Sequence, residues 1–195
     1  MNSPQIGKNA PKLGRTPAVA LCNPRFPHNV GAAVRAASCC GVSQVWYSGD
    51  RVQMAMDQKK RLPREERMKG FQDVELRQFD NFFDQFGPET VPVAVELRPN
   101  AESLPSFVHP ENALYVFGPE DGSIPQVMLR HCHRFLVIPT RHCVNLAAAA
   151  YLVLFDRMVK MASEPLTIRD TLAETRFDFA NDDFAEKLGL RSAER

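Results

Sequence analysis

The sequence has almost no net charge and no long hydrophobic run. Its 195 residues contain 24 Lys and Arg against 23 Asp and Glu, which gives a net charge of +1. Binding to nucleic acid would therefore need a local basic patch. The longest apolar run, Leu146–Phe155, has ten residues and is too short to span a bilayer. Residues 1–16 contain no apolar core of a signal peptide. We expect a cytoplasmic protein without a membrane anchor.

Cysteine chemistry is also poorly supported. The five cysteines are odd in number and include no CxxC pair, which argues against a disulfide framework or a zinc site and favours reduced thiols. The run His131-Cys132-His133 is no exception, because adjacent residues of a strand point to opposite faces. We expect no metal.

Three nucleotide and hydrolase motifs are missing. The first expected strand is not followed by GxGxxG, and neither GxxxxGK[ST] nor GxSxG occurs in the chain. These absences argue against an ordinary Rossmann dinucleotide site, a P-loop ATPase and an α/β-hydrolase.

Short apolar runs alternate with helical patterns and predict an α/β fold, with a mostly parallel sheet covered by helices on both faces. The expected strands are 18–23, 44–49, 91–97, 113–118 and 135–139, and the expected helices are 29–41, 79–86, 125–131 and 145–161. By composition, residues 1–16 are a disordered extension, residues 17–162 form the main domain, and the acidic segment 163–195 is a helical extension.

Polar residues stand at three of the predicted strand-to-helix junctions. They are Asn29 and Arg35 after the first strand, Glu120 in the turn 118–122, and Asn145 after the strand 135–139. The carboxyl ends of parallel strands meet at one edge of a sheet, so these junctions predict one composite site. Asn29 and Asn145 are also plausible N-caps. The turn 118–122 offers backbone donors and carboxylates, which suit an uncharged or cationic ligand such as a sulfonium.

The three junctions together resemble the signature motifs of the SpoU (TrmH-like) branch of the SPOUT RNA methyltransferases. The first motif reads Asn29-x-Gly31-Ala32-x-x-Arg35-Ala36 and the second Phe117-Gly118-Pro119-Glu120-x-Gly122. The third is Ile138-Pro139 followed by Asn145-Leu146. The likeness extends from about Ala18 to Met161 and keeps the order of the motifs.

The resemblance implies a homodimeric enzyme that uses S-adenosyl-L-methionine (AdoMet) to methylate a ribose 2′-hydroxyl of tRNA or rRNA. It also implies a deep C-terminal trefoil knot that forms the cofactor pocket. Its catalytic positions correspond to Arg35, Asn29, Glu120 and Asn145. Its cofactor-binding positions correspond to Leu97, Gly118, Ile138, Cys143 and Leu146. Two departures are Cys143 where the family has serine, and a short loop at 140–142.

RNA contacts are expected from two basic segments. Residues 59–69 hold six basic and two acidic side chains, and the loop of the third motif adds Arg141 and His142. The phosphate-binding candidates are Lys59, Lys60, Arg61, Arg64, Arg67 and Arg141. The default alternative for the basic run is a solvated charged face.

Two further functions remain open at this stage. One is a catalytically inactive RNA-binding protein of the same fold, suggested by Cys143 and the short loop. The other is a small-molecule α/β enzyme unrelated to RNA. For the methyltransferase itself, tRNA is favoured over rRNA because no appended RNA-binding domain is visible in the sequence.

Overall fold

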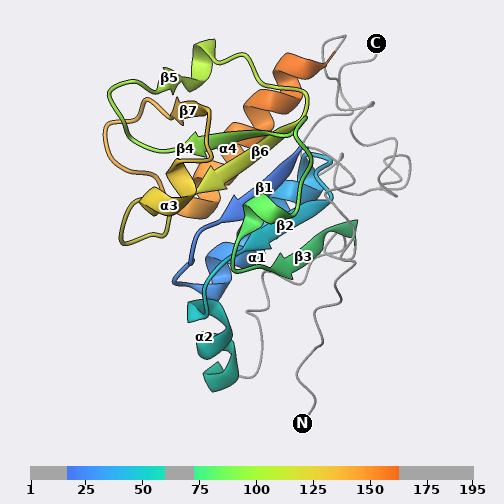
Figure 1. Cartoon of the computed structure of the whole chain (residues 1–195), viewed down its shortest axis with the longest axis vertical. Coiled ribbons are helices and arrows are strands. Elements are labelled where there is room, and N and C mark those ends of the chain that lie inside the picture. Colours follow the sequence, from blue (N-terminus) through green and yellow to red (C-terminus); the bar gives the residue numbers. More distant parts are fainter. Residues whose placement is uncertain (1–16, 60–72, 163–195) are drawn as a thin grey trace, which may run out of the picture. The chain divides into compact units, whose positions relative to one another are not determined.

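A seven-stranded sheet forms the centre of the part that the computed structural model describes, residues 17–59 and 73–162. The strands are β1 (Ala18–Leu21), β2 (Gln44–Tyr47), β3 (Glu75–Gln78), β4 (Val91–Val95), β5 (Glu102–Ser103), β6 (Ala113–Phe117) and β7 (Arg134–Val137). They lie in the order β3-β2-β1-β6-β4-β7-β5, and every neighbouring pair is parallel. The predicted α/β class with a parallel sheet is confirmed (Figure 1).

Helices cover both faces of this sheet. They are α1 (Pro27–Cys39), α2 (Arg51–Lys59), α3 (Gln126–Leu129) and α4 (Leu146–Met161), with the 3₁₀ helices η3 (Phe82–Asp84) and η4 (Leu104–Ser106). One core joins α1 and α4 to the sheet, and a second core on the opposite face joins α3 and η3 to it. The central strands β1 and β6 are continuous apolar runs because both of their faces are buried.

Strand β1 shows how one strand serves both cores. Val19 and Leu21 point into the core under α1 and α4, whereas Ala18, Ala20 and Cys22 point into the core under α3. All five are completely buried. This alternation follows from the two-residue period of a strand.

Several predicted elements differ from the structure. Helix α3 has four residues where 125–131 was expected, and 79–86 contains only the three-residue η3. The strands β3 and β5 and helix α2 were not predicted. Strand β3 pairs only with β2, at the edge of the sheet, and its residues are half-buried or exposed. It therefore lacks the apolar signal of a central strand.

Contacts divide the chain into two units, Met1–Lys160 and Met161–Arg195. The predictions for residues 1–16 and 163–195, and for the basic run beyond Lys59, fall outside the described residues. Within the described ranges, no helix is long and apolar enough to span a membrane.

Candidate active site

The two central strands place the first two motifs side by side. Strands β1 and β6 are hydrogen-bonded neighbours, with Leu21 opposite Phe117. From this pair the sheet grows through β2 and β3 on one side and through β4 and β7 on the other. The segments that follow β1 and β6 therefore leave the sheet at the point where the strand order reverses, which is where open α/β sheets bind ligands.

Three side chains, one from each motif, form a continuous hydrogen-bonded chain there. Asn145 Nδ2 donates to Asn29 Oδ1 at 3.0 Å, and Asn29 Nδ2 donates to Glu120 Oε1 at 2.6 Å. Asn29 is only 3% exposed. Both of its polar groups thus have partners, as the burial of an amide requires. The structure thus brings Asn29, Glu120 and Asn145 together at one place, as predicted from the three strand ends.

Glu120 is held by more than Asn29. The backbone N–H groups of Arg25 and Phe26 donate to its two carboxylate oxygens at 2.7 and 3.4 Å. Burial alone raises the pKa of this carboxyl, but the hydrogen bond from Asn29 and those from the backbone outweigh burial and hold the pKa below its ordinary 4.5. Glu120 is therefore a carboxylate at neutral pH.

The two asparagines have different roles in their helices. Asn145 caps α4 as predicted, since its Oδ1 accepts from the N–H groups of Ala147 and Ala148 at 2.9 and 3.3 Å. The prediction that Asn29 caps α1 is wrong. The N-cap is Phe26, and Pro27 at the first position starts the helix one turn earlier than expected. Asn29 lies inside the first turn, which frees its side chain for Glu120.

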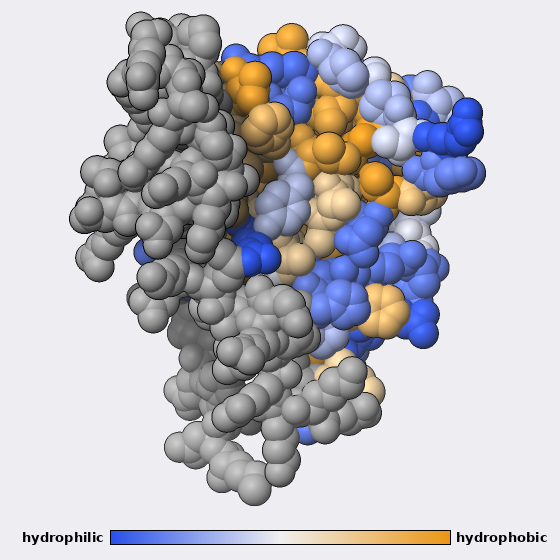
Figure 2. All heavy atoms as spheres, turned by 180° about the vertical axis from the view of Figure 1, so that it is seen from behind, coloured by the Kyte–Doolittle hydropathy of each residue, from blue (hydrophilic) through white to orange (hydrophobic). Residues whose placement is uncertain are grey.

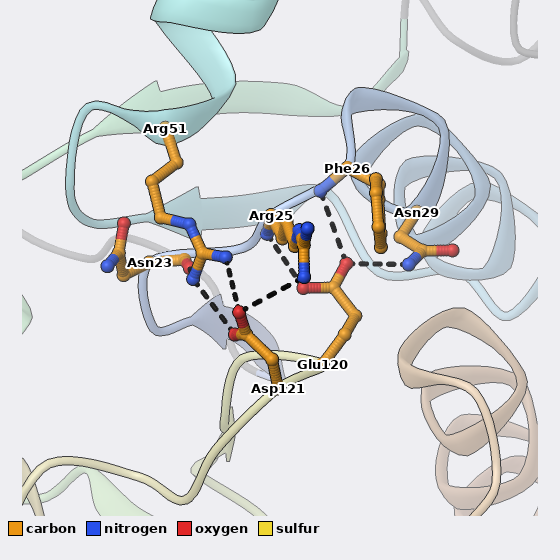
Figure 3. Close-up of polar contacts among 7 residues, drawn as sticks. All are labelled: Asn23, Arg25, Phe26, Asn29, Arg51, Glu120 and Asp121. Atoms are coloured by element: carbon orange, nitrogen blue, oxygen red, sulfur yellow. Dashed lines mark hydrogen bonds and ion pairs between the residues drawn. The ribbon is translucent and has the colours of Figure 1, made fainter.

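An ion pair ties the turn that holds Glu120 to the start of helix α2. Arg51, at the start of α2, donates to both oxygens of Asp121 at 3.0 and 2.8 Å and to the carbonyl oxygen of Asn23 at 3.3 Å. The Arg51 hydrogen bonds hold the pKa of Asp121 below its usual value. Arg25 contacts the same carboxylate at 3.5 Å. Figure 3 shows these groups surrounding the turn.

A cavity of about 500 Å³ lies beside this network, at the carboxyl ends of β4, β6 and β7. All five predicted cofactor-binding residues line it: Leu97, Gly118, Ile138, Cys143 and Leu146. Glu120 also lines it, whereas Asn29 and Asn145 do not. The cavity thus meets the hydrogen-bonded chain at Glu120.

Arg35 stands apart from both features. It is half-buried in α1 and does not line the cavity. Among the described residues it has no hydrogen-bond or ion-pair partner, although its charge reaches the hydroxyl of Tyr151 on α4. Burial raises the pKa of Tyr151, and Arg35 opposes that rise. No residue of the ranges 17–59 and 73–162 therefore occupies its guanidinium.

The predicted RNA-binding residues are only partly described. Arg141 and His142 are exposed and line the cavity. Lys59 ends α2. The remaining candidates, Lys60, Arg61, Arg64 and Arg67, fall outside the described residues.

Sequence reasoning missed two contacts that shape the site. Glu96, directly after β4, lines the cavity and accepts a hydrogen bond from the Ile124 N–H at 2.9 Å. The pair of Arg51 and Asp121 was also missed. A charged residue directly after a buried strand was the available signal for Glu96. Nothing local connects Arg51 to a residue seventy positions later.

The sequence profile of the SpoU rRNA Methylase family matches residues 17–155. The chain belongs to this family. The matched segment runs from β1 into α4, so it contains all three motifs and the cavity. A search of curated proteins found no match.

Solved structures support the fold of this SpoU-family chain. A crystal structure of A. aeolicus TrmH/SpoU tRNA modifying enzyme has a TM-score of 0.60 at 17% identity, over 91% of this chain and 89% of that one. A structure concerned with 2-OH methylation of C/U34 on tRNA has a TM-score of 0.60 at 22% identity, over 74% and 92%.

The third structure is an rRNA methyltransferase from Sinorhizobium meliloti, with a TM-score of 0.57 at 20% identity. The match covers 75% of this chain but only 56% of that one. Another structure from the same organism is that of an AdoMet-bound rRNA methyltransferase. At these identities the three structures show a shared fold.

Proposed function

We propose that the protein is an AdoMet-dependent RNA methyltransferase that methylates a ribose 2′-hydroxyl, with tRNA as the favoured substrate. The observation that supports this most is the hydrogen-bonded chain of Asn145, Asn29 and Glu120 at the edge of a 500 Å³ cavity. It brings the three motifs of the SpoU family together at one place. The protein is proposed to act in the cytoplasm.

The cavity fits AdoMet in size and in charge. Its volume lies in the usual range for small-molecule sites. Its wall combines apolar side chains such as Ile138 and Leu146 with the carboxylates of Glu96 and Glu120. A sulfonium cation is favoured near such carboxylates. When bound, AdoMet supplies an activated methyl group.

Gly118 tests this assignment, because it has no room for a side chain. A Cβ there would lie 3.0 Å from the backbone nitrogen of Ile124, the same group that donates to Glu96. We expect Gly118→Ala to weaken AdoMet binding about tenfold in isothermal titration calorimetry. The matched control is Gly122→Ala in the same turn, where the Cβ would make an ordinary 3.6 Å contact. Equal affinities for the two variants would contradict the assignment.

The residues of the chain have separate roles in the proposed reaction. The hydrogen-bonded side chains of Asn145, Asn29 and Glu120 fix the wall of the cavity next to the reacting groups. Such positioning provides much of the rate of an in-line displacement. The guanidinium of Arg35 has no partner within the part of the chain that the structure describes, which suits binding of an RNA phosphate and orientation of the ribose hydroxyl. As a literal base it is disfavoured, because the guanidinium group of arginine stays protonated in proteins.

The path of the chain around β7 is compatible with the proposed trefoil knot. Strand β7 lies between β4 and β5, which are joined by residues 96–101 alone. Val95 is paired with Leu136, and so is Glu102, so this short loop arches around the end of β7. The segment that leaves β7 lines the same cavity as this loop, through Ile138 and Thr140 on one side and Glu96 and Leu97 on the other.

A row of exposed apolar residues on α4 supports the proposed homodimer. Leu152, Phe155, Val159 and Met161 are 42–57% exposed. The first three recur at helical spacing on one side of the helix. Figure 2 shows apolar side chains gathered on the face of the molecule where α1 and α4 lie. Contiguous apolar surface of this kind is typical of protein interfaces.

The proposal is tested by transfer of labelled methyl from AdoMet to unmodified total tRNA and, separately, to unmodified rRNA. We expect label in tRNA, and alkaline hydrolysis should leave a resistant dinucleotide at the labelled position, because a 2′-O-methyl group blocks cleavage. Label in rRNA alone would identify the alternative substrate. AdoMet and RNA binding without transfer to either RNA would identify an inactive RNA-binding protein, and no AdoMet binding would exclude a methyltransferase.

A further inference from the structure

Next to the proposed active site, three planar side chains form an exposed stack. The rings of Phe26 and His28 are stacked with their centroids 5.2 Å apart and an interplanar angle of 21°. The Arg25 guanidinium lies over the Phe26 ring, 5.1 Å from its centroid. Phe26 is 38% exposed, the Arg25 side chain 53% exposed, and His28 is also exposed. An exposed phenylalanine whose ring contacts two polar planar groups contributes little to the core.

The stack is held rigidly against the site. The backbone N–H groups of Arg25 and Phe26 donate to Glu120, so the segment is fixed to the carboxylate that meets the cavity. Pro24 and Pro27 flank this segment and limit its backbone freedom. Figure 3 shows that Arg25, Phe26 and Asn29 reach Glu120 from the same stretch of chain. A group bound on the stack therefore lies beside the reacting centre.

The Arg25 guanidinium remains available at this surface. Its contact with Asp121 is long, at 3.5 Å, because Arg51 occupies both oxygens of that carboxylate at 3.0 and 2.8 Å. Aromatic rings and guanidinium planes are the groups on which unpaired RNA bases stack, whereas bases inside a duplex are inaccessible to them.

We propose that Arg25, Phe26 and His28 form a stacking platform for an unpaired base next to the methylated nucleotide. This inference rests on the proposed function and narrows its substrate to RNA whose target lies in a loop or single strand. Stacking uses the π-face that every base has, so the platform positions the RNA without reading its sequence.

The test is binding of a fluorescein-labelled single-stranded oligoribonucleotide, followed by fluorescence anisotropy. We expect Phe26→Leu, which keeps the apolar bulk but loses the ring, to bind about tenfold more weakly. Phe26→Trp should bind at least as tightly as wild type. The slope of log Kd against log salt should stay unchanged in Phe26→Leu, because no phosphate contact is lost. The same oligonucleotide annealed to its complement should bind more weakly than the single strand.

The matched control is Phe83→Leu. Phe83 also stacks on a histidine, His131, with centroids 4.4 Å apart, but this stack joins η3 to the turn after α3, outside the platform and the cavity wall. Phe83→Leu should leave the affinity for the oligoribonucleotide unchanged. Thermal unfolding and calorimetry of AdoMet binding verify that each variant is folded.

The outcomes separate the platform from the proposed function. If wild type methylates RNA and Phe26→Leu binds the single strand equally well, the platform is wrong and the function stands. Equal affinity of wild type for single strand and duplex also contradicts the platform. If wild type neither binds nor methylates RNA, the proposed function fails and the platform fails with it.

Discussion

Replacing Arg35 by alanine should lower the rate of methyl transfer to RNA about a thousandfold, while the affinity for AdoMet changes less than about twofold. Arg35 does not line the cavity, so cofactor binding does not depend on it. Its guanidinium has no partner among the described residues, and a half-buried arginine left free is one available for a ligand. The substitution removes the RNA phosphate contact that we propose for Arg35, and loss of such a positioned charged group typically costs 10²- to 10⁴-fold in rate.

The measurement is single-turnover transfer of labelled methyl to tRNA, with AdoMet affinity determined in parallel by calorimetry. Arg35→Lys separates the two proposed roles of Arg35, binding a phosphate and orienting the ribose hydroxyl. Lysine retains part of the phosphate contact, but it lacks the planar guanidinium group that would orient the hydroxyl. Arg130→Ala, at an exposed arginine directly after α3, is the matched control and should transfer methyl at the wild-type rate. A near-normal rate for Arg35→Ala would remove Arg35 from the catalytic centre.

Replacing Asn29 by alanine should both destabilise the protein and inactivate it. The substitution leaves Glu120 without its 2.6 Å donor and Asn145 without its 3.0 Å acceptor. Of these two groups Glu120 is half-buried and Asn145 is exposed, so water replaces the lost partner of Asn145. We therefore expect a loss of about 2 kcal/mol in the free energy of unfolding, mostly from Glu120 and measured with urea. Displacement of Glu120 should reduce methyl transfer at least a hundredfold.

The control for Asn29→Ala is Asn81→Ala. Asn81 also accepts a backbone hydrogen bond, from Phe83 at 3.1 Å, but only as the cap of η3. Its removal should cost about 1 kcal/mol and leave the reaction unchanged. If Asn29→Ala were no less stable than Asn81→Ala, the hydrogen bonds of Asn29 would not be an energetic link between the motifs.

Asn29→Asp adds a dependence on pH to the same test. It places a second carboxylate against Glu120 Oε1, the atom that Asn29 contacts at 2.6 Å. Two carboxylates that close raise the pKa of one of them above its ordinary value. A carboxyl group whose pKa is higher in the folded than in the unfolded protein stabilises the fold at pH values below its unfolded-state pKa. This stabilisation is lost as the pH rises through the folded-state pKa. Relative to Asn29→Ala, the Asp variant should therefore lose stability as pH rises, which urea unfolding at several pH values will measure.

Much of the architecture can be predicted from local sequence. The continuous apolar runs of β1 and β6 predict central parallel strands, because only strands buried on both faces can be apolar throughout. Asn145 before an apolar helix predicts its own capping role, which depends on the N–H groups two and three residues later. The edge strand β3 could not be predicted in this way, since its half-buried, charged residues follow no apolar pattern.

The sequence by itself determined that Asn29, Glu120 and Asn145 stand at the ends of buried strands, and through the motif resemblance it identified the residues around the cavity. Only the tertiary structure decided how they meet. The hydrogen bond between Asn29 and Glu120 joins residues 91 positions apart, and that between Asn145 and Asn29 joins residues 116 apart. The first contact exists because β1 and β6 are neighbours in the sheet. The second exists because α4, which Asn145 caps, packs with α1 in one core. Strand order is set by packing of the whole sheet, and no local spacing encodes it.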